Sequence, residues 1–319
     1  MTLVKFLGTK LPLAALAAAV APTGGAADAG AVDWAKVQGK DLTLLYPAQM
    51  SWELVLTQAE HSGASKFREG KNCRQCHEGD EDSSGNLMVG DKSIEPTPIA
   101  GKPGYVKANI KFARDDDNLM VRVEFSPDKQ PDAKMDPKVE SRVAVMFDDG
   151  KVPEVSRGGC WAACHIDLAK MPKGTDDGAT MYLPKSRNGM TRDGGGVVKP
   201  ADELAKIRAE GGYTEYWEAS LNPGAPASVI DGTILDKRQE NAAHAVTATA
   251  AFENGKWAVV FSRKLAAGEG HKDIAAGKLY TVGFAIHAGH TNKRFHYVSL
   301  EKTFVLDSGA ADFTAKRAP

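Results

Sequence analysis

The four cysteines of this 319-residue chain form two close pairs, and a histidine directly follows each pair. The first run is Cys73-Arg74-Gln75-Cys76-His77, and the second is Cys160-Trp161-Ala162-Ala163-Cys164-His165. Two neighbouring thiols followed by an imidazole are typical of a haem attachment site: the thiols add to the vinyl groups, and the histidine ligates the iron. We therefore predict two covalently bound haem c groups, with His77 and His165 as iron ligands.

The two runs differ in spacing. Cys73 and Cys76 have the standard two residues between them, whereas three residues separate Cys160 from Cys164. A zinc knuckle would need further ligands at matching spacing, and a thioredoxin-like dithiol would need a βαβ context that the sequence lacks. In the second run the extra residue must loop out for both sulfurs to reach the vinyl groups. A local disulfide beside a surface histidine is the alternative there.

The ligand at the sixth position of each iron largely sets its function, because a position filled by His or Met favours electron transfer. For the first haem we predict His61, which lies twelve residues before Cys73. It follows a helix that we expect over residues 51–59, capped by Ser51. Met88 and Met50 are the thioether alternatives.

For the second haem, His287, His290 and His296 lie within ten residues of one another. His296 alternates with Val298 and Leu300, so it should share their apolar strand face. A buried imidazole needs a partner, which an iron would supply. This pattern slightly favours His296 as the distal ligand, with His287 and His290 as alternatives.

The first residues have the pattern of a secretory signal. Lys5 and Lys10 precede or flank a short apolar run at 11–21, and Ala27-Asp28-Ala29 is a suitable cleavage site. We predict a signal peptide over residues 1–29 and a periplasmic protein. No later apolar segment is long enough to cross a bilayer, so the mature chain is not expected to span a membrane. With 40 basic and 41 acidic residues, no basic excess indicates nucleic acid as a partner.

A stretch rich in Pro and Gly, residues 92–104, predicts a boundary between an N-terminal c-type haem segment (30–98) and a larger domain (99–310). In the larger domain, alternating apolar residues and turn signals predict strands, and Asn254-Gly255 predicts a hairpin. The expected strands are 106–112, 119–125, 142–147, 245–252, 257–263, 279–287 and 295–300. One clear helix is expected at 201–210, and long loops at 166–199. The predicted fold class is mainly β, an antiparallel β-sandwich preceded by a small, partly helical haem segment.

This larger domain resembles a known haem-binding domain, the cytochrome c-552/DMSO reductase-like type. Gamma subunits of ethylbenzene and dimethylsulfide dehydrogenases share it, as do some exported multihaem c-type cytochromes. The resemblance covers roughly residues 96–306 and rests on the order of loose motifs along the chain. These motifs are 115–125, 143–147, Tyr216-Trp217-Glu218-Ala219, 255–265, Gly283-Phe284-Ala285-Ile286 and 294–299.

The resemblance implies an antiparallel β-sandwich that holds a haem. In the gamma subunits this haem is b-type and is ligated by Met and Lys. The Lys lies three residues before a Ser, a spacing that places His296 ahead of Ser299 here. The Met falls in the segment where this chain has residues 160–165. The resemblance therefore favours His296 as the second distal ligand, with covalent attachment and two histidines replacing Met and Lys.

These features predict an exported dihaem electron carrier in an anaerobic respiratory or related chain. Its partners would be another cytochrome, a quinol oxidoreductase or a terminal reductase, and no catalytic residue is predicted. A haem enzyme, such as a peroxidase or a reductase of small nitrogen or sulfur oxides, is the alternative. That function needs one open iron and a pocket lined by His287, His290, Lys293 and Arg294. An electron-transfer subunit of a molybdenum oxidoreductase is a further alternative implied by the resemblance.

Overall fold

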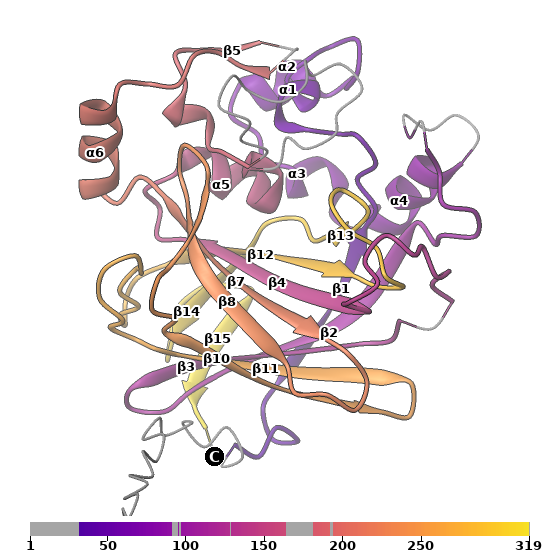
Figure 1. Cartoon of the computed structure of the whole chain (residues 1–319). Helices are drawn as coiled ribbons and strands as arrows, with labels where there is room; N and C mark the ends of the chain where they lie inside the picture. Colours follow the sequence, from indigo (N-terminus) through magenta and orange to yellow (C-terminus); the bar gives the residue numbers. More distant parts are fainter. Residues whose placement is uncertain are drawn as a thin grey trace, which may run out of the picture.

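Strands dominate the computed structural model of this chain, which describes residues 32–90, 95, 97–127, 129–163, 181–191 and 194–318 (Figure 1). The mainly β fold class predicted from the sequence is confirmed. The predicted signal peptide, residues 1–29, lies outside the described residues, and so do Cys164 and His165.

Most strands belong to one sheet that folds over into two layers. The first layer runs β10-β11-β3-β2-β1, and the second continues through β13-β12-β4-β7-β8-β9. The strands of the first layer are β1 (Gly39–Leu45), β2 (Tyr105–Arg114), β3 (Asn118–Phe125), β10 (Val246–Glu253) and β11 (Lys256–Lys264). Those of the second layer are β4 (Ser141–Asp148), β7 (Thr214–Leu221), β8 (Ser228–Ile234), β9 (Arg238–Glu240), β12 (Tyr280–His287) and β13 (Tyr297–Val298).

The two layers are joined along one side at two places. At one end β1 pairs with β13 through Leu45 and Val298. At the other end β14 (Lys302–Leu306) pairs with β12, and β15 (Phe313–Arg317) pairs with both β14 and β2. The pairings of β15 are parallel, whereas the other pairings of this sheet are antiparallel in the part of the chain that the structure describes.

Local sequence signals account for the hairpins between these strands. Asn254 and Gly255 have φ angles of 51° and 76°, the left-handed conformation that a two-residue hairpin turn needs. At the β2–β3 turn the Asp115 carboxylate accepts hydrogen bonds from the backbone N–H groups of Asp117 (2.8 Å) and Asn118 (2.6 Å). The strands predicted around these turns are confirmed. The predicted strand at 295–300 is reduced to the two residues of β13, and β1 was not predicted.

The main core lies between the two layers. Fully or nearly fully buried side chains of one layer, such as Ile110 and Val121, meet those of the other, such as Val145 and Phe284. Alternation along each strand sends the remaining side chains outward. On β7 this places Trp217 in the core, while its neighbour Tyr216 points to a second apolar cluster on the outer face.

That outer face of the second layer is covered by short helices (Figure 1). The helices are α1 (Trp52–Val55), α2 (Ala64–Arg68), α3 (Arg74–His77), α5 (Pro153–Gly158), the 3₁₀ helices η2 (Gly159–Ala163) and η3 (Pro184–Ser186), and α6 (Ala201–Ala209). Trp52, Phe67 and Val155 from three of them pack with Met146 of β4 and Ile234 of β8. The helices thus form a second core with the outside of the sandwich. Helix α4 (Glu81–Val89) instead packs against β1 and β2.

Two helices had been predicted. Residues 201–210 do form α6. The helix expected over 51–59 starts where predicted, since the Ser51 hydroxyl caps it by accepting from the Leu54 N–H, but it ends at Val55. The chain from 30 to 98 also contributes β1, which pairs along its whole length with β2. No described helix is both long and apolar enough to cross a membrane.

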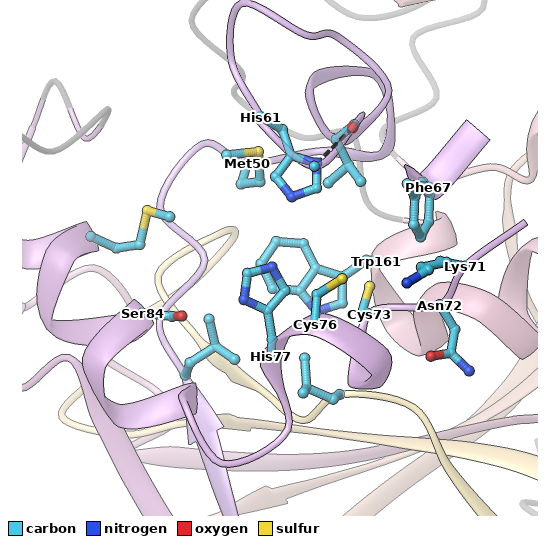
Figure 2. Close-up of a pocket in the computed structure, with 15 residues that line it drawn as sticks. Met50, His61, Phe67, Lys71, Asn72, Cys73, Cys76, His77, Ser84 and Trp161 are labelled. Atoms are coloured by element: carbon cyan, nitrogen blue, oxygen red, sulfur yellow. Dashed lines mark hydrogen bonds between the residues drawn. The ribbon is translucent and has the colours of Figure 1, made fainter. Parts of the chain in front are cut away.

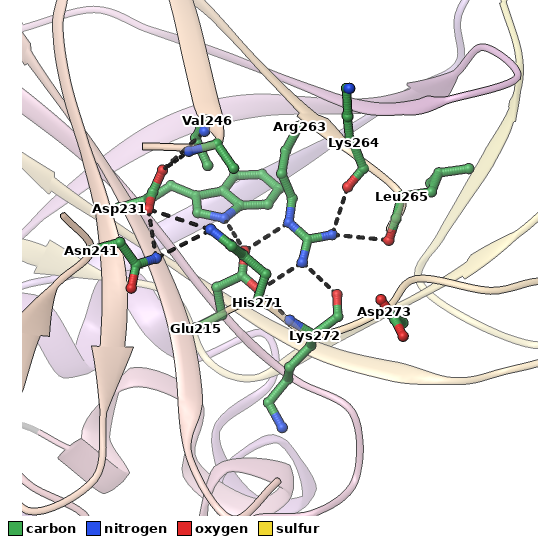
Figure 3. A network of polar contacts seen from close by, with 12 residues as sticks. Glu215, Asp231, Asn241, Val246, Arg263, Lys264, Leu265, His271, Lys272 and Asp273 are labelled. Atoms are coloured by element: carbon green, nitrogen blue, oxygen red, sulfur yellow. Dashed lines mark hydrogen bonds and ion pairs between the residues drawn. The ribbon is translucent and has the colours of Figure 1, made fainter. Parts of the chain in front are cut away.

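A buried polar network holds β7 to the segment after β11 (Figure 3). The Glu215 carboxylate accepts hydrogen bonds from Trp217 Nε1 (2.7 Å), Arg263 Nη2 (2.8 Å) and the Lys272 N–H (2.7 Å). His271 Nδ1 lies 3.1 Å from the same carboxylate. Glu215 and Arg263 are almost fully buried, so the loss of either charge would leave the other buried without a partner.

Candidate haem sites

The first Cys/His run lies at the bottom of a pocket between the helices and the sandwich (Figure 2). Helix α3 starts directly after Cys73 and carries Cys76 and His77, so all three side chains line this pocket. The pocket and its mouth contain about 720 Å³ of space without protein atoms. Its apolar wall consists of Leu45, Met50, Val55, Phe67, Met88, Trp161 and Leu300.

His61 faces His77 across this pocket (Figure 2). The two ring centroids are 6.0 Å apart, and the ring planes make an angle of 32°. Two metal–imidazole bonds of about 2 Å each, with each centroid about 1.2 Å behind its nitrogen, would place the centroids about 6.4 Å apart, close to the observed separation. The separation of these rings therefore suits one iron ligated by both.

The orientation of His61 is fixed by the backbone. Its Nδ1 lies 2.9 Å from the carbonyl oxygen of Val55. A carbonyl oxygen only accepts, so Nδ1 carries the proton and Nε2 has a free lone pair. Such a hydrogen bond from the non-ligating nitrogen is the usual support of a metal-bound histidine. The ring also packs against Gly63, where an added Cβ would lie 3.1 Å from its Cε1 atom.

The thioether alternatives, Met50 and Met88, line the same pocket. The candidate ligands predicted from the sequence, His61, Met50 and Met88, thus all line the pocket that contains His77. Among them, His61 is the imidazole that lies opposite His77. Burial raises the pKa of the Cys73 thiol and lowers the pKa of His77. A thiol with a raised pKa is a poor nucleophile, which disfavours a reactive redox dithiol.

Polar contacts anchor the first run to the sandwich. The Cys73 N–H donates to the Arg157 carbonyl of α5 at 3.0 Å. The Arg157 guanidinium stacks over Phe67 at 4.4 Å from the ring centroid and donates to the backbone carbonyls of Lys71 and Phe67. The Arg74 N–H donates to Glu301 at 3.1 Å, and burial raises the pKa of Glu301 to about 7. The attachment site is therefore a rigid part of the larger fold.

A second pocket lies nearby on the outer face of the second layer. Cys160, His287 and His296 line it, and with its mouth it contains about 1180 Å³. Cys160 packs directly onto β12 at Gly283, where an added Cβ would lie 2.7 Å from the sulfur. A side chain at 283 would therefore displace Cys160. Of the second Cys/His run, Cys164 and His165 lie outside the described residues.

His287 and His296 are close neighbours in this second pocket, with ring centroids 4.9 Å apart. Both donate to the same acceptor, the Lys293 carbonyl oxygen, but with different nitrogens. His296 uses Nδ1 (2.8 Å), which leaves Nε2 with a lone pair, as in His61. His287 uses Nε2 (2.9 Å), so its lone pair is on Nδ1, next to its own Cβ. The contact pattern of a ligating histidine is thus found at His296.

Burial keeps both imidazoles neutral. It lowers the pKa of His296 to about 4 and that of His287 well below its ordinary value. The neutral imidazole is the form that ligates a metal. The third alternative, His290, is not among the residues that line this pocket, and its Nδ1 lies 3.2 Å from Asp132.

Charged side chains at the second pocket were missed in the sequence. Arg142 of β4 and Arg238 of β9 both line it and both lie near Glu218, at 4.0 and 3.3 Å. Guanidinium groups are suited to bind the carboxylates of a haem. The alternation along β4 and β7 places Arg142 and Glu218 on the outer face. That Arg238 of β9 lies beside them depends on the order of the strands in the sheet, which the sequence alone does not show.

A buried amine was also missed. Lys102 is only 5% exposed, and its Nζ has no hydrogen-bond partner among the residues that the structure describes. It lies over the rings of Tyr297 and Tyr46, at 4.1 and 5.3 Å from their centroids. Burial lowers the pKa of Lys102 to about 7. In the sequence this residue is one of two Lys in the Gly- and Pro-rich stretch 92–104, with no signal of burial.

Comparison with known proteins identifies a family and two related cytochromes. The model of the ethylbenzene dehydrogenase family matches residues 222–299. Cytochrome c-552 of Stutzerimonas stutzeri is 34% identical over 303 residues, which cover 92% of this chain and 94% of that protein. Cytochrome c-551 of Rhodocyclus tenuis is 26% identical over 274 residues, covering 85% of this chain and 92% of that one.

Among solved structures, a family 9 carbohydrate-binding module from Caldicellulosiruptor kristjanssonii in complex with cellotriose overlaps with a TM-score of 0.28 and 9% identity. It covers 61% of this chain and 65% of its own. A similarity at this level supports no statement about function. The similarity to cytochrome c-552 extends over nearly the whole chain. The chain belongs to the c-type cytochrome family that includes cytochrome c-552 of Stutzerimonas stutzeri, and it contains a domain of the ethylbenzene dehydrogenase type.

Proposed function

We propose that this protein is a periplasmic dihaem c-type cytochrome that carries single electrons between redox proteins. The observation that carries the proposal is the opposed pair His61 and His77 above Cys73 and Cys76. An iron with both axial positions filled by protein side chains exchanges electrons without binding a substrate. The names of its cytochrome relatives support the same class of function.

At the first site, Cys73 and Cys76 would hold the haem by thioether bonds, His77 would be the proximal ligand, and His61 would be the distal one. The Val55 carbonyl and Gly63 set the position of the distal ring. The bound haem supplies a one-electron couple between ferric and ferrous iron. The apolar residues that line the pocket would limit the access of water to it.

At the second site, Cys160, Cys164 and His165 would provide the attachment and the proximal ligand. We assign the distal position to His296, because its Nε2 is the nitrogen left without the Lys293 contact. Arg142 and Arg238 would pair with the haem carboxylates at the pocket mouth.

Ligation by two histidines favours a lower reduction potential than ligation by His and Met. We therefore expect a carrier of low potential. Its partners would be another cytochrome, a quinol oxidoreductase or a terminal reductase. Export would depend on the signal peptide predicted at residues 1–29.

The test is a haem count and a spectrum of the exported holoprotein. We expect the mass of the chain plus two haems, and low-spin spectra that carbon monoxide and cyanide leave unchanged. The mass of a single haem would contradict the dihaem assignment. A high-spin component that binds either ligand would instead favour the haem-enzyme alternative.

The first distal ligand is tested by His61→Ala with Met88→Ala as the matched control. His61→Ala should convert one haem to a high-spin form that binds carbon monoxide, because the opposing imidazole is lost. Met88→Ala removes a side chain from the same pocket and should leave both haems low-spin. The reverse result would assign the distal position to Met88.

A further inference from the structure

The two pockets share a wall, and one peptide bond crosses it. Cys160 lines the second pocket, whereas the next residue, Trp161, lines the first. The segment after β12 crosses the same wall, since His296 lines the second pocket and Leu300 lines the first. Consecutive Cα atoms are about 3.8 Å apart. The two pockets therefore approach each other most closely at Cys160 and Trp161.

Glycines on three sides fix the position of this dipeptide. Gly283 of β12 accommodates the Cys160 sulfur. Gly159 has a φ of 53° and faces the Glu301 backbone, where an added Cβ would lie 3.3 Å from the Cα atom. Gly158 faces the ring of Trp52, at 2.9 Å for an added Cβ. Because larger residues would disturb each contact, the dipeptide has little freedom to move.

The side chain of Trp161 points into the first pocket, beside Cys73, Cys76 and His77 (Figure 2). Its Nε1 is buried and has no hydrogen-bond partner among the described parts of the chain. A buried N–H without an acceptor is costly. Because protein atoms shield this nitrogen, Trp161 would meet a haem in the first pocket with its ring and not with its N–H.

We propose that Cys160 and Trp161 form the connection through which electrons pass between the two haems. This inference rests on the proposed dihaem function. Trp161 would contact the first haem with its ring, while Cys160 would hold the second haem by a thioether bond. In the step, one electron leaves the ferrous iron of one haem and reduces the ferric iron of the other. No bond breaks, and no proton is transferred.

The test compares Trp161→Leu and Trp161→Phe in the holoprotein. The readouts are the rate at which an injected electron equilibrates between the haems and the potential of each haem. Leu removes the aromatic contact and should slow equilibration on the order of tenfold. Phe keeps a ring at the same place, so it should equilibrate nearly as fast as the wild type and leave the potentials of both haems unchanged.

Trp257→Phe is the matched control, because Trp257 is buried in the sandwich core and lines neither pocket. It should change neither readout. An unchanged equilibration rate in Trp161→Leu with both haems attached would overturn the inference. If that variant does not fold, Trp161→Met decides, since an unchanged equilibration rate in it would likewise overturn the inference. A wild-type mass with one haem would refute the dihaem function itself, which separates the two failures.

Discussion

Replacement of Lys102 by methionine is expected to stabilise the protein at neutral and acidic pH. The Lys102 amine is buried, and the described residues offer it two tyrosine rings but no hydrogen-bond acceptor. Burial lowers its pKa from 10.5 to about 7, so the folded protein holds this proton less tightly than the unfolded chain does. Methionine has a similar length and no charge, and it fills irregular apolar space well.

The magnitude follows from this difference in proton affinity. At about 1.36 kcal/mol for each pKa unit, a change from 10.5 to about 7 corresponds to about 5 kcal/mol for a charged Lys102 in the folded state. The cation–π contacts with Tyr297 and Tyr46 would offset about 1–2 kcal/mol in a site this dry. Lys102→Met should therefore raise the free energy of unfolding at pH 6 by about 3 kcal/mol.

The pH dependence gives a second, independent signature. Below pH 7 both the folded and the unfolded chain carry the proton, and the folded state bears the full cost. Between about pH 7 and 10.5 the unfolded chain binds a proton that the folded chain lacks, so the stability of the wild type rises with pH. The slope is about 1.4 kcal/mol for each pH unit. Lys102→Met should lack this rise.

The assay is denaturant unfolding of the holoprotein at pH 6 and pH 9, with Lys107→Met as the control. Lys107 is exposed on the neighbouring strand β2, so its replacement should change stability little at either pH. If Lys102→Met were no more stable than the wild type at pH 6, or if its advantage were equal at both pH values, the reasoning from burial would be wrong.

Three further predictions concern the second pocket and the polar network. His296→Ala should make the second haem high-spin while His287→Ala leaves it low-spin, because only His296 has Nε2 available; electron paramagnetic resonance distinguishes the two, and equal spectra would contradict the assignment. Gly283→Ala should reduce attachment of the second haem and destabilise the fold by about 1–3 kcal/mol, because the new Cβ would lie 2.7 Å from the Cys160 sulfur. Intact mass measures the haem content and thermal unfolding the stability, and a fully loaded variant as stable as the wild type would refute this prediction. Glu215→Gln should lower the free energy of unfolding by about 3–5 kcal/mol, because the buried Arg263 charge would lose its carboxylate partner. Glu240, which pairs with His244 at the surface, is the control: Glu240→Gln should lower it by no more than about 1 kcal/mol. Thermal unfolding of both variants tests this prediction, and equal losses of stability would refute it.

The sequence carried much of the fold because its strongest signals are local. The alternation in β2 and β3 and the Asn254-Gly255 turn depend on neighbouring residues alone, and they predicted these elements correctly. Helix α4 and strand β1 were missed because their stability comes from tertiary contacts. Gly85 of α4, for example, lies so close to the Gly104 backbone that an added Cβ would be 1.9 Å from its carbonyl oxygen.

The same division applies to the candidate sites. Cys73, Cys76 and His77 lie within five residues, so their chemistry is visible in the sequence. The choice between His287 and His296 depends on which nitrogen of each ring faces the Lys293 carbonyl, and sequence patterns contain no information about that. The role inferred for Trp161 depends on two pockets meeting at one peptide bond, which required the folded chain.

The pairing of Leu45 with Val298 has a consequence for the order in which the chain folds. Strand β1 lies near the start of the described chain, but its second partner, β13, lies near the end. The two layers therefore cannot be joined at this end until the chain as far as β13 is available, and such distant pairings form slowly. During this delay the thiols of Cys73 and Cys76 are not yet enclosed by the sandwich. The late closure of the sheet thus leaves a period in which haem can be attached before folding buries the site.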